Sequence, residues 1–207
     1  MIITYNGLEA IKVQFGNTVL AFNPISKDSK QKATSFGADI VLVSINHRDM
    51  NGIEQASRGE VRTFAVTGPG EYEIGGVFIK GLPSKSNYGG KEKINTIYSV
   101  NLENMNLCFL GALENTNLSE EVISALDDID VLFIPIGSNG VLGPAEAEKL
   151  SVSLEPSIII PMHYDNDSLK KFLKEAGAED VKPVDKMTLK KKDLEGKESE
   201  IVVLEAQ

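Results

Sequence analysis

The sequence predicts one layered α/β domain, and two observations support this. The N-terminal part reads as short strands separated by turns, whereas the C-terminal part alternates strands with helices. We see neither a linker rich in Gly, Pro or Ser nor an internal repeat of fixed period. We therefore expect residues 1–207 to form a single domain.

The N-terminal strands are predicted by alternation and by turn residues. Residues 10–15 alternate apolar and polar side chains, which is the period of a half-buried strand. Gly16-Asn17 predicts a turn, after which the apolar run at residues 18–22 predicts the returning strand. Asn23 and the proline after it end this strand.

The central part of the chain contains a buried strand and then several further strands. The β-branched run at residues 39–44 suits a strand that is covered on both faces. A helix is expected to start after it, with Asn51 as its N-cap. The Gly75-Gly76 pair predicts a hairpin turn. The further strands predicted here span residues 61–66, 72–74, 77–80, 96–102 and 107–110.

The C-terminal part alternates strands and helices. Apolar runs at residues 130–135 and 157–161 predict buried strands, and closing strands are predicted at Leu189 and at residues 201–204. Three helices are predicted with recognisable ends, namely residues 121–126 capped by Ser119, 144–154 with Pro144 in the first turn, and 167–176 ended by Gly177.

Composition and charge narrow the classes of function. The net charge of −9 gives a surface that repels phosphate backbones, so we expect no nucleic-acid partner. No apolar run approaches the length of a membrane span, and the N-terminal residues do not resemble a secretory signal. The single cysteine, Cys108, lies in an apolar run and is expected to be buried. A cytoplasmic location without membrane association is the resulting expectation.

The two histidines are candidates for chemistry because of their position. His47 and His163 each follow an apolar strand, and each has an aspartate two residues later, Asp49 and Asp165. Strand ends are where open α/β sheets place their ligand sites, and imidazole and carboxylate are common metal ligands. A His-x-Asp pair alone is a weak signal, and its spacing does not outweigh the more usual surface or hydrogen-bonding role of two isolated histidines.

Several segments resemble, in the correct order, motifs of the metallo-β-lactamase superfamily. Residues 39–51 resemble its strand and first metal motif, in which Thr/Ser-His-x-His-x-Asp-His follows a strand. The other matching segments are residues 68–77, 95–98 with 110–113, 130–137 and 158–164. Residues 68–77 resemble the branch that includes ascorbate-phosphate-lactonase-like proteins. The resemblance implies an α/β fold of the four-layer αββα type, with two mixed sheets covered by helices on their outer faces.

The departures from the family pattern concern the metal ligands. The resemblance implies that His47, Asp49 and His163 are retained metal-ligand positions, with Asp49 and His47 as candidate catalytic residues. The remaining family ligand positions are substituted, and they hold Ile45, Met50, Ser86 and Ala112. A catalytic zinc normally needs three protein ligands and an open position for water. The resemblance therefore implies a degenerate metal site, at which His47, Asp49 and His163 should converge at one edge.

Two hypotheses about function follow. The first is a pseudoenzyme that uses the old cleft as a binding or assembly module for a small molecule or a protein. The alternative is a metal-dependent hydrolase of a lactone or phosphate ester, with one weakly bound divalent metal, zinc or manganese. Asp49 and His163 would hold this metal, with help from His47 or Asp165. A metal-free hydrolase that uses Ser44 or Ser86 with His47 as base is less favoured, because no nucleophile-elbow motif occurs. The partner stays unknown, and a homo-oligomer is possible.

Overall fold

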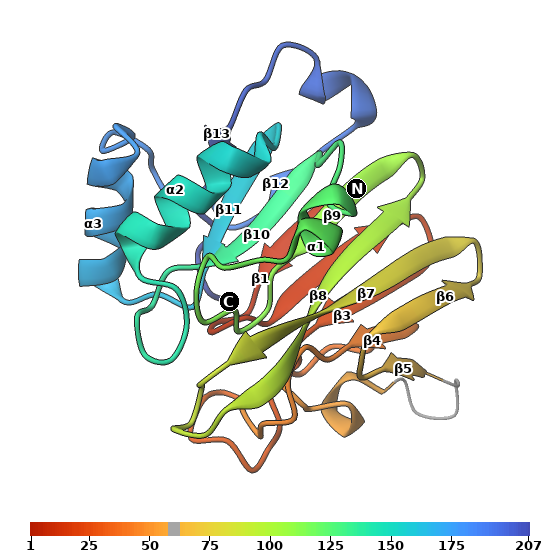
Figure 1. Ribbon diagram of the computed structural model, residues 1–207. Coiled ribbons are helices and arrows are strands. Elements are labelled where there is room, and N and C mark those ends of the chain that lie inside the picture. The colour runs from red at the N-terminus through yellow and green to blue at the C-terminus, as the bar shows by residue number, and fades with distance from the viewer. Residues whose placement is uncertain (58–62) are drawn as a thin grey trace.

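The structure, a computed structural model, describes residues 1–57 and 63–207. Two β-sheets pack face to face, and helices lie on the outer side of one of them (Figure 1). The fold is thus the α/β sandwich expected of the metallo-β-lactamase type.

The first sheet has six strands in the order β12-β1-β2-β3-β4-β5. The first three strands in the chain pair antiparallel, whereas β3, β4 and β5 are mutually parallel. Parallel pairing matters for the site because the carboxyl ends of these strands reach the same edge. The strand bounds are β1 Ile2–Tyr5, β2 Ile11–Phe15, β3 Thr18–Phe22, β4 Ile40–Leu42, β5 Phe64–Val66 and β12 Met187–Thr188.

The second sheet has seven strands in the order β13-β11-β10-β9-β8-β7-β6. Its strands β9, β10, β11 and β13 are parallel, and the strands on the other side form antiparallel hairpins. The bounds are β6 Gly70–Ile74, β7 Val77–Ser86, β8 Lys93–Leu102, β9 Met105–Phe109, β10 Val131–Pro135, β11 Ile158–Met162 and β13 Glu200–Ile201.

The main core fills the space between the sheets. The ring of Phe22 from β3 stacks on that of Phe109 from β9, with centroids 4.8 Å apart, and lies 5.8 Å from the ring of Phe133 in β10. These side chains are fully buried, and aromatic pairs of this kind stabilise a core beyond the area that they bury. These ring contacts join β3 of the first sheet to β9 and β10 of the second, so they hold the two sheets at a fixed distance.

The helices cover the outer face of the seven-stranded sheet. A second hydrophobic cluster joins β10 and β11 to α1 (Glu120–Ser124), α2 (Pro144–Leu154) and α3 (Asn166–Glu175). Over the six-stranded sheet, the described residues supply only the 3₁₀ turn η1 (Glu54–Ala56) and irregular chain. A second 3₁₀ turn, η2 (Lys191–Leu194), precedes the last strand.

Most predicted elements agree with the structure. Helix α2 has the predicted bounds, and Ser119 caps α1 through its hydroxyl. Gly75 and Gly76 both have positive φ, as a tight hairpin turn requires. The α-helix expected after Asn51 is instead the single turn η1. Of the strand expected at residues 61–66, the first two residues lie outside the described residues.

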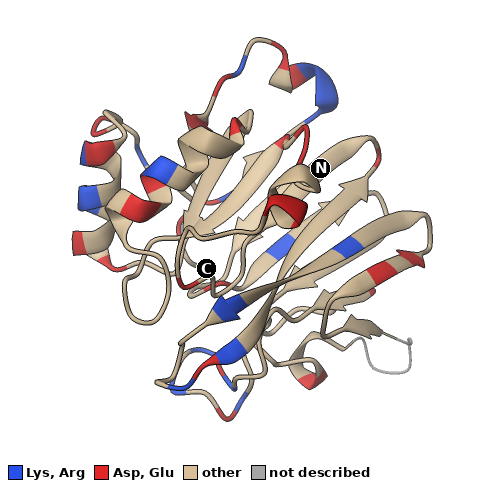
Figure 2. Cartoon of the chain, in the orientation of Figure 1, with Lys and Arg blue, Asp and Glu red and all other residues tan. Residues whose placement is uncertain are grey.

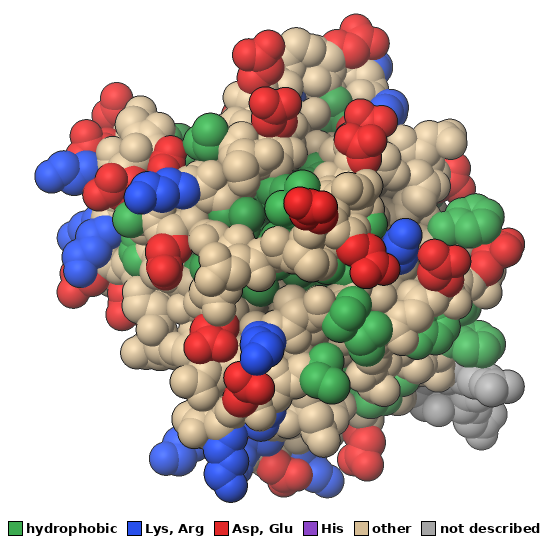
Figure 3. Space-filling model, in the orientation of Figure 1, with side chains coloured by type: hydrophobic (Ala, Val, Ile, Leu, Met, Phe, Trp, Pro, Cys, Tyr) green, Lys and Arg blue, Asp and Glu red, His purple; other side chains and the backbone are tan. Residues whose placement is uncertain are grey.

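Among the residues that the structure describes, the helices leave part of the outer face of β6, β7 and β8 uncovered. Figure 3 shows hydrophobic side chains gathered on this side of the molecule, where Phe78 and Ile94 are 54% and 68% exposed. Charges of both signs are spread over the helices, as Figure 2 shows for α2 and α3. Among the residues that the structure describes, no helix is long and apolar enough to cross a membrane.

Candidate functional site

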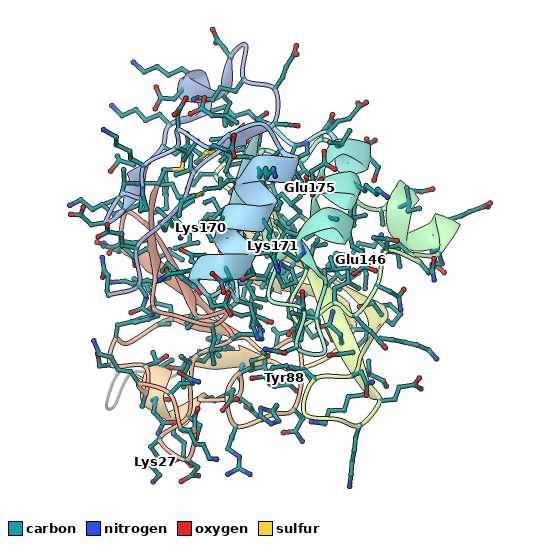
Figure 4. The ribbon with its side chains drawn as sticks, turned by 90° about the vertical axis from the view of Figure 1, so that its left-hand side faces the viewer. Lys27, Tyr88, Glu146, Lys170, Lys171 and Glu175 are labelled. Atoms are coloured by element: carbon teal, nitrogen blue, oxygen red, sulfur yellow. The ribbon has the colours of Figure 1, made fainter. Side chains whose placement is uncertain are left out.

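The candidate residues meet at the edge where the parallel strands end. His47 lies in the loop after β4, Ala112 follows β9, and His163 directly follows β11. Tyr88 reaches the same place from the loop between β7 and β8, as the view in Figure 4 shows for its labelled side chain below the helices. The convergence of His47, Asp49 and His163 expected from the sequence is therefore present, with Tyr88 among them.

Tyr88 lies between the two histidines. Its ring is 4.9 Å from the ring of His47 and 5.1 Å from that of His163, and both pairs are T-shaped. Its hydroxyl donates a hydrogen bond of 2.8 Å to Oδ2 of Asp49. One half-buried phenol thus contacts all three retained ligand positions.

Both carboxylate oxygens of Asp49 have partners. Ser29 Oγ donates to Oδ1 at 2.6 Å, and Tyr88 donates to Oδ2. Burial favours the neutral carboxyl, but these two hydrogen bonds and the neighbouring His47 outweigh it, so the pKa of Asp49 lies below its ordinary value. Burial and the bond to Asp49 raise the pKa of the Tyr88 phenol well above its ordinary value. At neutral pH the Tyr88 phenol is therefore a protonated donor, and its acceptor Asp49 is ionised.

His47 is held by its own loop. Its Nδ1 accepts a hydrogen bond of 3.2 Å from the backbone N–H of Asp49 and lies 3.6 Å from Asp49 Oδ2. Burial lowers the pKa of the imidazole; Asp49 opposes this effect and the Lys93 cation adds to it. His47 is thus favoured as a neutral ring whose Nδ1 acts as an acceptor.

An apolar cluster occupies the side of the site where the family's other ligands would lie. Ile45, Met50, Ala112 and Val141 form one buried group, and Tyr88 packs against it. Each of the four is at most 4% exposed, so the substituted positions point inward and make contact with one another. The fourth substituted position, Ser86, is also buried, and its hydroxyl accepts a hydrogen bond from the backbone N–H of Tyr88.

His163 belongs to a buried polar network. Its Nδ1 lies 2.7 Å from Oε1 of Glu9, a carboxylate that is fully buried. The other oxygen of Glu9 accepts from Asn23 Nδ2 at 2.7 Å, and the same Nδ2 lies 2.8 Å from Ser44 Oγ. Every one of these polar groups has a partner, which is the condition for burying them without a large cost.

The backbone at His163 is shaped to bring its side chain to the edge. His163 has φ of 55°, a left-handed conformation that is uncommon for residues other than glycine. Its N–H bonds the carbonyl of Leu8, which lies next to Glu9. A Cβ at Gly137 would lie 2.1 Å from the His163 carbonyl oxygen, so only glycine allows this approach.

The residues present do not fit a catalytic metal ion in this arrangement. The oxygens of Asp49 and one ring nitrogen of each histidine bond to protein groups, and the Tyr88 ring fills the space between the imidazoles. Within residues 1–57 and 63–207, no three His, Cys, Asp or Glu side chains are grouped closely enough to share a metal. The metal role of His47, Asp49 and His163 stays a prediction from the family resemblance.

A cleft of about 510 Å³ opens beside this edge. Its lining includes His163, Tyr88, Tyr5, Tyr164 and Asp165. Asp165 does not reach the histidines by any hydrogen bond in the described part of the chain; its Oδ1 caps helix α3. The cleft is of the size that small molecules occupy in proteins.

Sequence reasoning missed Glu9 and Tyr88. Glu9 lies between apolar strands in a turn, where a carboxylate reads as exposed, and its partner His163 is 154 residues away. Tyr88 stands beside a Gly-Gly pair in what reads as a loop tip. A buried role for either residue depends on contacts between distant segments. The proximity of Tyr88 to Ser86, a substituted ligand position, was the one available signal.

Known proteins with similar sequences support the family. A metal-dependent hydrolase of Listeria welshimeri is 26% identical over 198 residues, covering 80% of this chain and 86% of its own. One of Bacillus thuringiensis is 25% identical with the same coverage. Among solved structures, a Zn-dependent hydrolase of the metallo-β-lactamase superfamily from Thermotoga maritima has a TM-score of 0.77 and 26% identity, covering 100% of this chain and 99% of its own.

The family model described as the β-lactamase superfamily domain matches residues 2–163. This range contains both sheets except for their last strands, and it ends at His163. The protein therefore belongs to the metallo-β-lactamase superfamily.

Proposed function

We propose that this protein is a non-catalytic member of its superfamily, which binds a ligand in the cleft beside the former metal site. The observation that carries the proposal is the position of Tyr88, whose ring lies between His47 and His163 and whose hydroxyl bonds Asp49. A hydrolytic metal site needs an open coordination position for water. Here a side chain of the protein lies between the ligands instead.

The apolar cluster supports the same proposal from the other side. Weakening one ligand would leave a polar cavity, whereas Ile45, Met50, Ala112 and Val141 pack together without exposure to water. A cation placed there would lose hydration without gaining donor atoms, which is strongly unfavourable. The substituted side chains thus pack together as one small hydrophobic core.

Elemental analysis of protein purified without a chelator or a histidine tag tests the proposal. We expect less than 0.1 metal ion per chain, by the rough rule that two ligands hold zinc weakly, and no uptake of added zinc or manganese in calorimetry. Near-stoichiometric metal that His163→Ala abolishes would contradict the proposal. That result would favour the alternative, a metal-dependent hydrolase like its named relatives, and would justify assays with lactones and phosphate esters.

A further inference from the structure

A second cleft, of about 220 Å³, opens on the outer face of the six-stranded sheet. Its lining includes Thr4 of β1 and Lys12 of β2, which are register partners. Both residues alternate with buried neighbours along their strands, so their side chains point away from the main core. The loop residues Lys32 and Ser35 form part of the wall. This Lys12 cleft shares no lining residue with the cleft beside His163.

The charged side chains that line the Lys12 cleft are all positive. Lys12 and Lys32 are in the lining and no Asp or Glu is, although the chain as a whole has a net charge of −9. The Lys12 ammonium forms no hydrogen bond or ion pair with the described residues and lies 5.4 Å from the centroid of the Phe36 ring. Lys32 Nζ donates to the main-chain oxygen of Gln207 at 3.1 Å. An ammonium has three donors, so both lysines can still bond a further acceptor.

Neutral polar groups of the same cleft also lack partners. Asn6 Nδ2 is the only side-chain nitrogen or oxygen in the described part of the chain that is buried without a hydrogen bond. The hydroxyls of Thr4 and Ser35 form no hydrogen bond within residues 1–57 and 63–207. Buried polar groups in folded proteins are nearly always paired, and an unpaired one calls for water, an ion or a ligand. The unpaired groups of this chain therefore gather where its lysines do.

We propose that the Lys12 cleft binds a compact dianion with several oxygens, namely a phosphate or sulfate group, either free or on a small molecule. Its oxygens accept hydrogen bonds from the two lysines and from the hydroxyls of Thr4 and Ser35. The Asn6 amide gains an acceptor that the chain itself does not supply. Charge-assisted hydrogen bonds of this kind are stronger than neutral ones.

The number of donors favours a tetrahedral dianion over other ligands. A monocarboxylate has two oxygens and one negative charge, so it would leave donors of the cleft unpaired. An organic cation would meet Lys12 and Lys32 without a carboxylate side chain to balance them. The inference goes beyond the proposed function and does not depend on it, because His47, Asp49 and His163 take no part in this cleft.

NMR titrations of the whole chain with sodium phosphate, sodium sulfate and sodium acetate test the proposal. They are made at about pH 7.5, above the second pKa of a phosphate group, with sodium chloride holding the ionic strength constant. We expect saturable shifts of the backbone amides of Thr4, Asn6 and Lys32 with phosphate and with sulfate. Acetate should bind at least about tenfold more weakly, as the loss of one charged hydrogen bond predicts. Thermal stability is a poor readout here, because phosphate and sulfate stabilise folded proteins in general.

Two lysine variants provide a matched comparison. Lys12→Gln removes one positive charge from the cleft and keeps a long polar side chain on the outer face of β2, so the fold should be retained. We expect it to weaken phosphate binding about fivefold, the size of one partly exposed ion pair. Lys30→Gln changes the net charge equally at an exposed position outside the lining, and it should leave the affinity within about twofold of wild type.

Asn6→Ala distinguishes a binding role from a structural one. The variant deletes a buried donor that has no partner, so the unfolding free energy in chloride buffer should stay the same or rise. Its affinity for phosphate should fall at least about threefold, as the loss of a neutral hydrogen bond predicts. A residue that only supported the fold would show the opposite pattern.

Three results would overturn the anion site. These are shifts that do not saturate or that chloride and acetate reproduce, a Lys12→Gln variant with wild-type phosphate affinity, and an Asn6→Ala variant that loses stability but keeps its affinity. Each of them leaves the proposed function standing, because that function concerns the other cleft. Conversely, a stoichiometric metal that His163→Ala abolishes would contradict the proposed function and leave the anion site in place.

Discussion

The two sides of the edge that carries His47, Asp49 and His163 differ in how their buried side chains are stabilised. On one side, Ile45, Met50, Ala112 and Val141 form an apolar cluster closed by Tyr88. On the other side, Glu9, Asn23 and Ser44 hold His163 in a buried and fully paired polar network. Buried polar or charged side chains without hydrogen-bond partners or a bound cation would destabilise the fold. The difference teaches that such a site can be stabilised either by removing polarity or by pairing it, and this protein does both within one edge.

Substitutions in the polar network around His163 should lower the unfolding free energy more than substitutions in the apolar cluster. Replacing Glu9 with Leu removes the buried acceptor of the His163 ring and one of the two acceptors of Asn23 Nδ2, so we expect a loss of about 4 kcal/mol in unfolding free energy. Urea denaturation measures this loss. Glu9→Gln keeps an acceptor oxygen and should cost less than half as much. Equal costs for the two variants would mean that the network contributes only packing.

The apolar side should reject the carboxylate that the family pattern places there. Ala112→Asp would bury a charge among Ile45, Met50 and Val141, with an expected cost of about 3 kcal/mol. Ala112→Asn has the same shape without the charge and separates the two effects. We expect zinc to leave the thermal midpoint of Ala112→Asp unchanged. A zinc-dependent rise would show that this side still accepts a metal.

Tyr88 joins the two sides, and its hydroxyl can be tested alone. Tyr88→Phe keeps the ring between the histidines but removes the donor to Asp49, at an expected cost of about 1.5 kcal/mol at neutral pH. Tyr72→Phe, at an exposed tyrosine that bonds only the backbone, should change stability by less than about 0.5 kcal/mol.

The difference in unfolding free energy between wild type and Tyr88→Phe should depend on pH in a defined direction. Because the pKa of Asp49 is held below its ordinary value, its charge stabilises the fold above the unfolded pKa, about 3.9. That contribution disappears as the pH falls through the lower, folded value. The stability difference between wild type and Tyr88→Phe should therefore be constant from pH 7 to about pH 5 and shrink below about pH 4. A difference that grows in acid would contradict the assignment of Asp49 as an anion.

The last prediction concerns a residue away from this edge. Cys108 is buried in β9, and burial raises the pKa of its thiol well above the ordinary value. Its reaction with a thiol reagent at pH 8 should be slower than in denaturant by on the order of 10³-fold, since the thiolate forms only when the chain opens. Variants of the edge should accelerate labelling in proportion to their loss of stability, and equal rates in all of them would indicate local opening of β9.

The sequence predicted the frame of the molecule better than the content of its site. Short-range sequence signals were sufficient to predict α2, with Pro144 in its first turn, and the hairpin at Gly75-Gly76. The family resemblance was sufficient to place Ile45, Met50 and Ala112 together. It could not indicate that Tyr88 lies between the histidines, because that position depends on how a loop packs. Nor could it indicate the burial of Glu9, because an acid in a turn is usually solvated.

The bond between Glu9 and His163 has a consequence for the order of folding. These residues are 154 positions apart, and Tyr88 and Asp49 are 39 apart, so the edge is closed by contacts of very different range. Long-range contacts form late because a large loop must be ordered first. The hairpin carrying Tyr88 can reach Asp49 while strand β11 is still unstructured, whereas Glu9 stays in water until that strand docks. We therefore expect the cleft to be completed in the last stage of folding, when the C-terminal third of the chain joins the first.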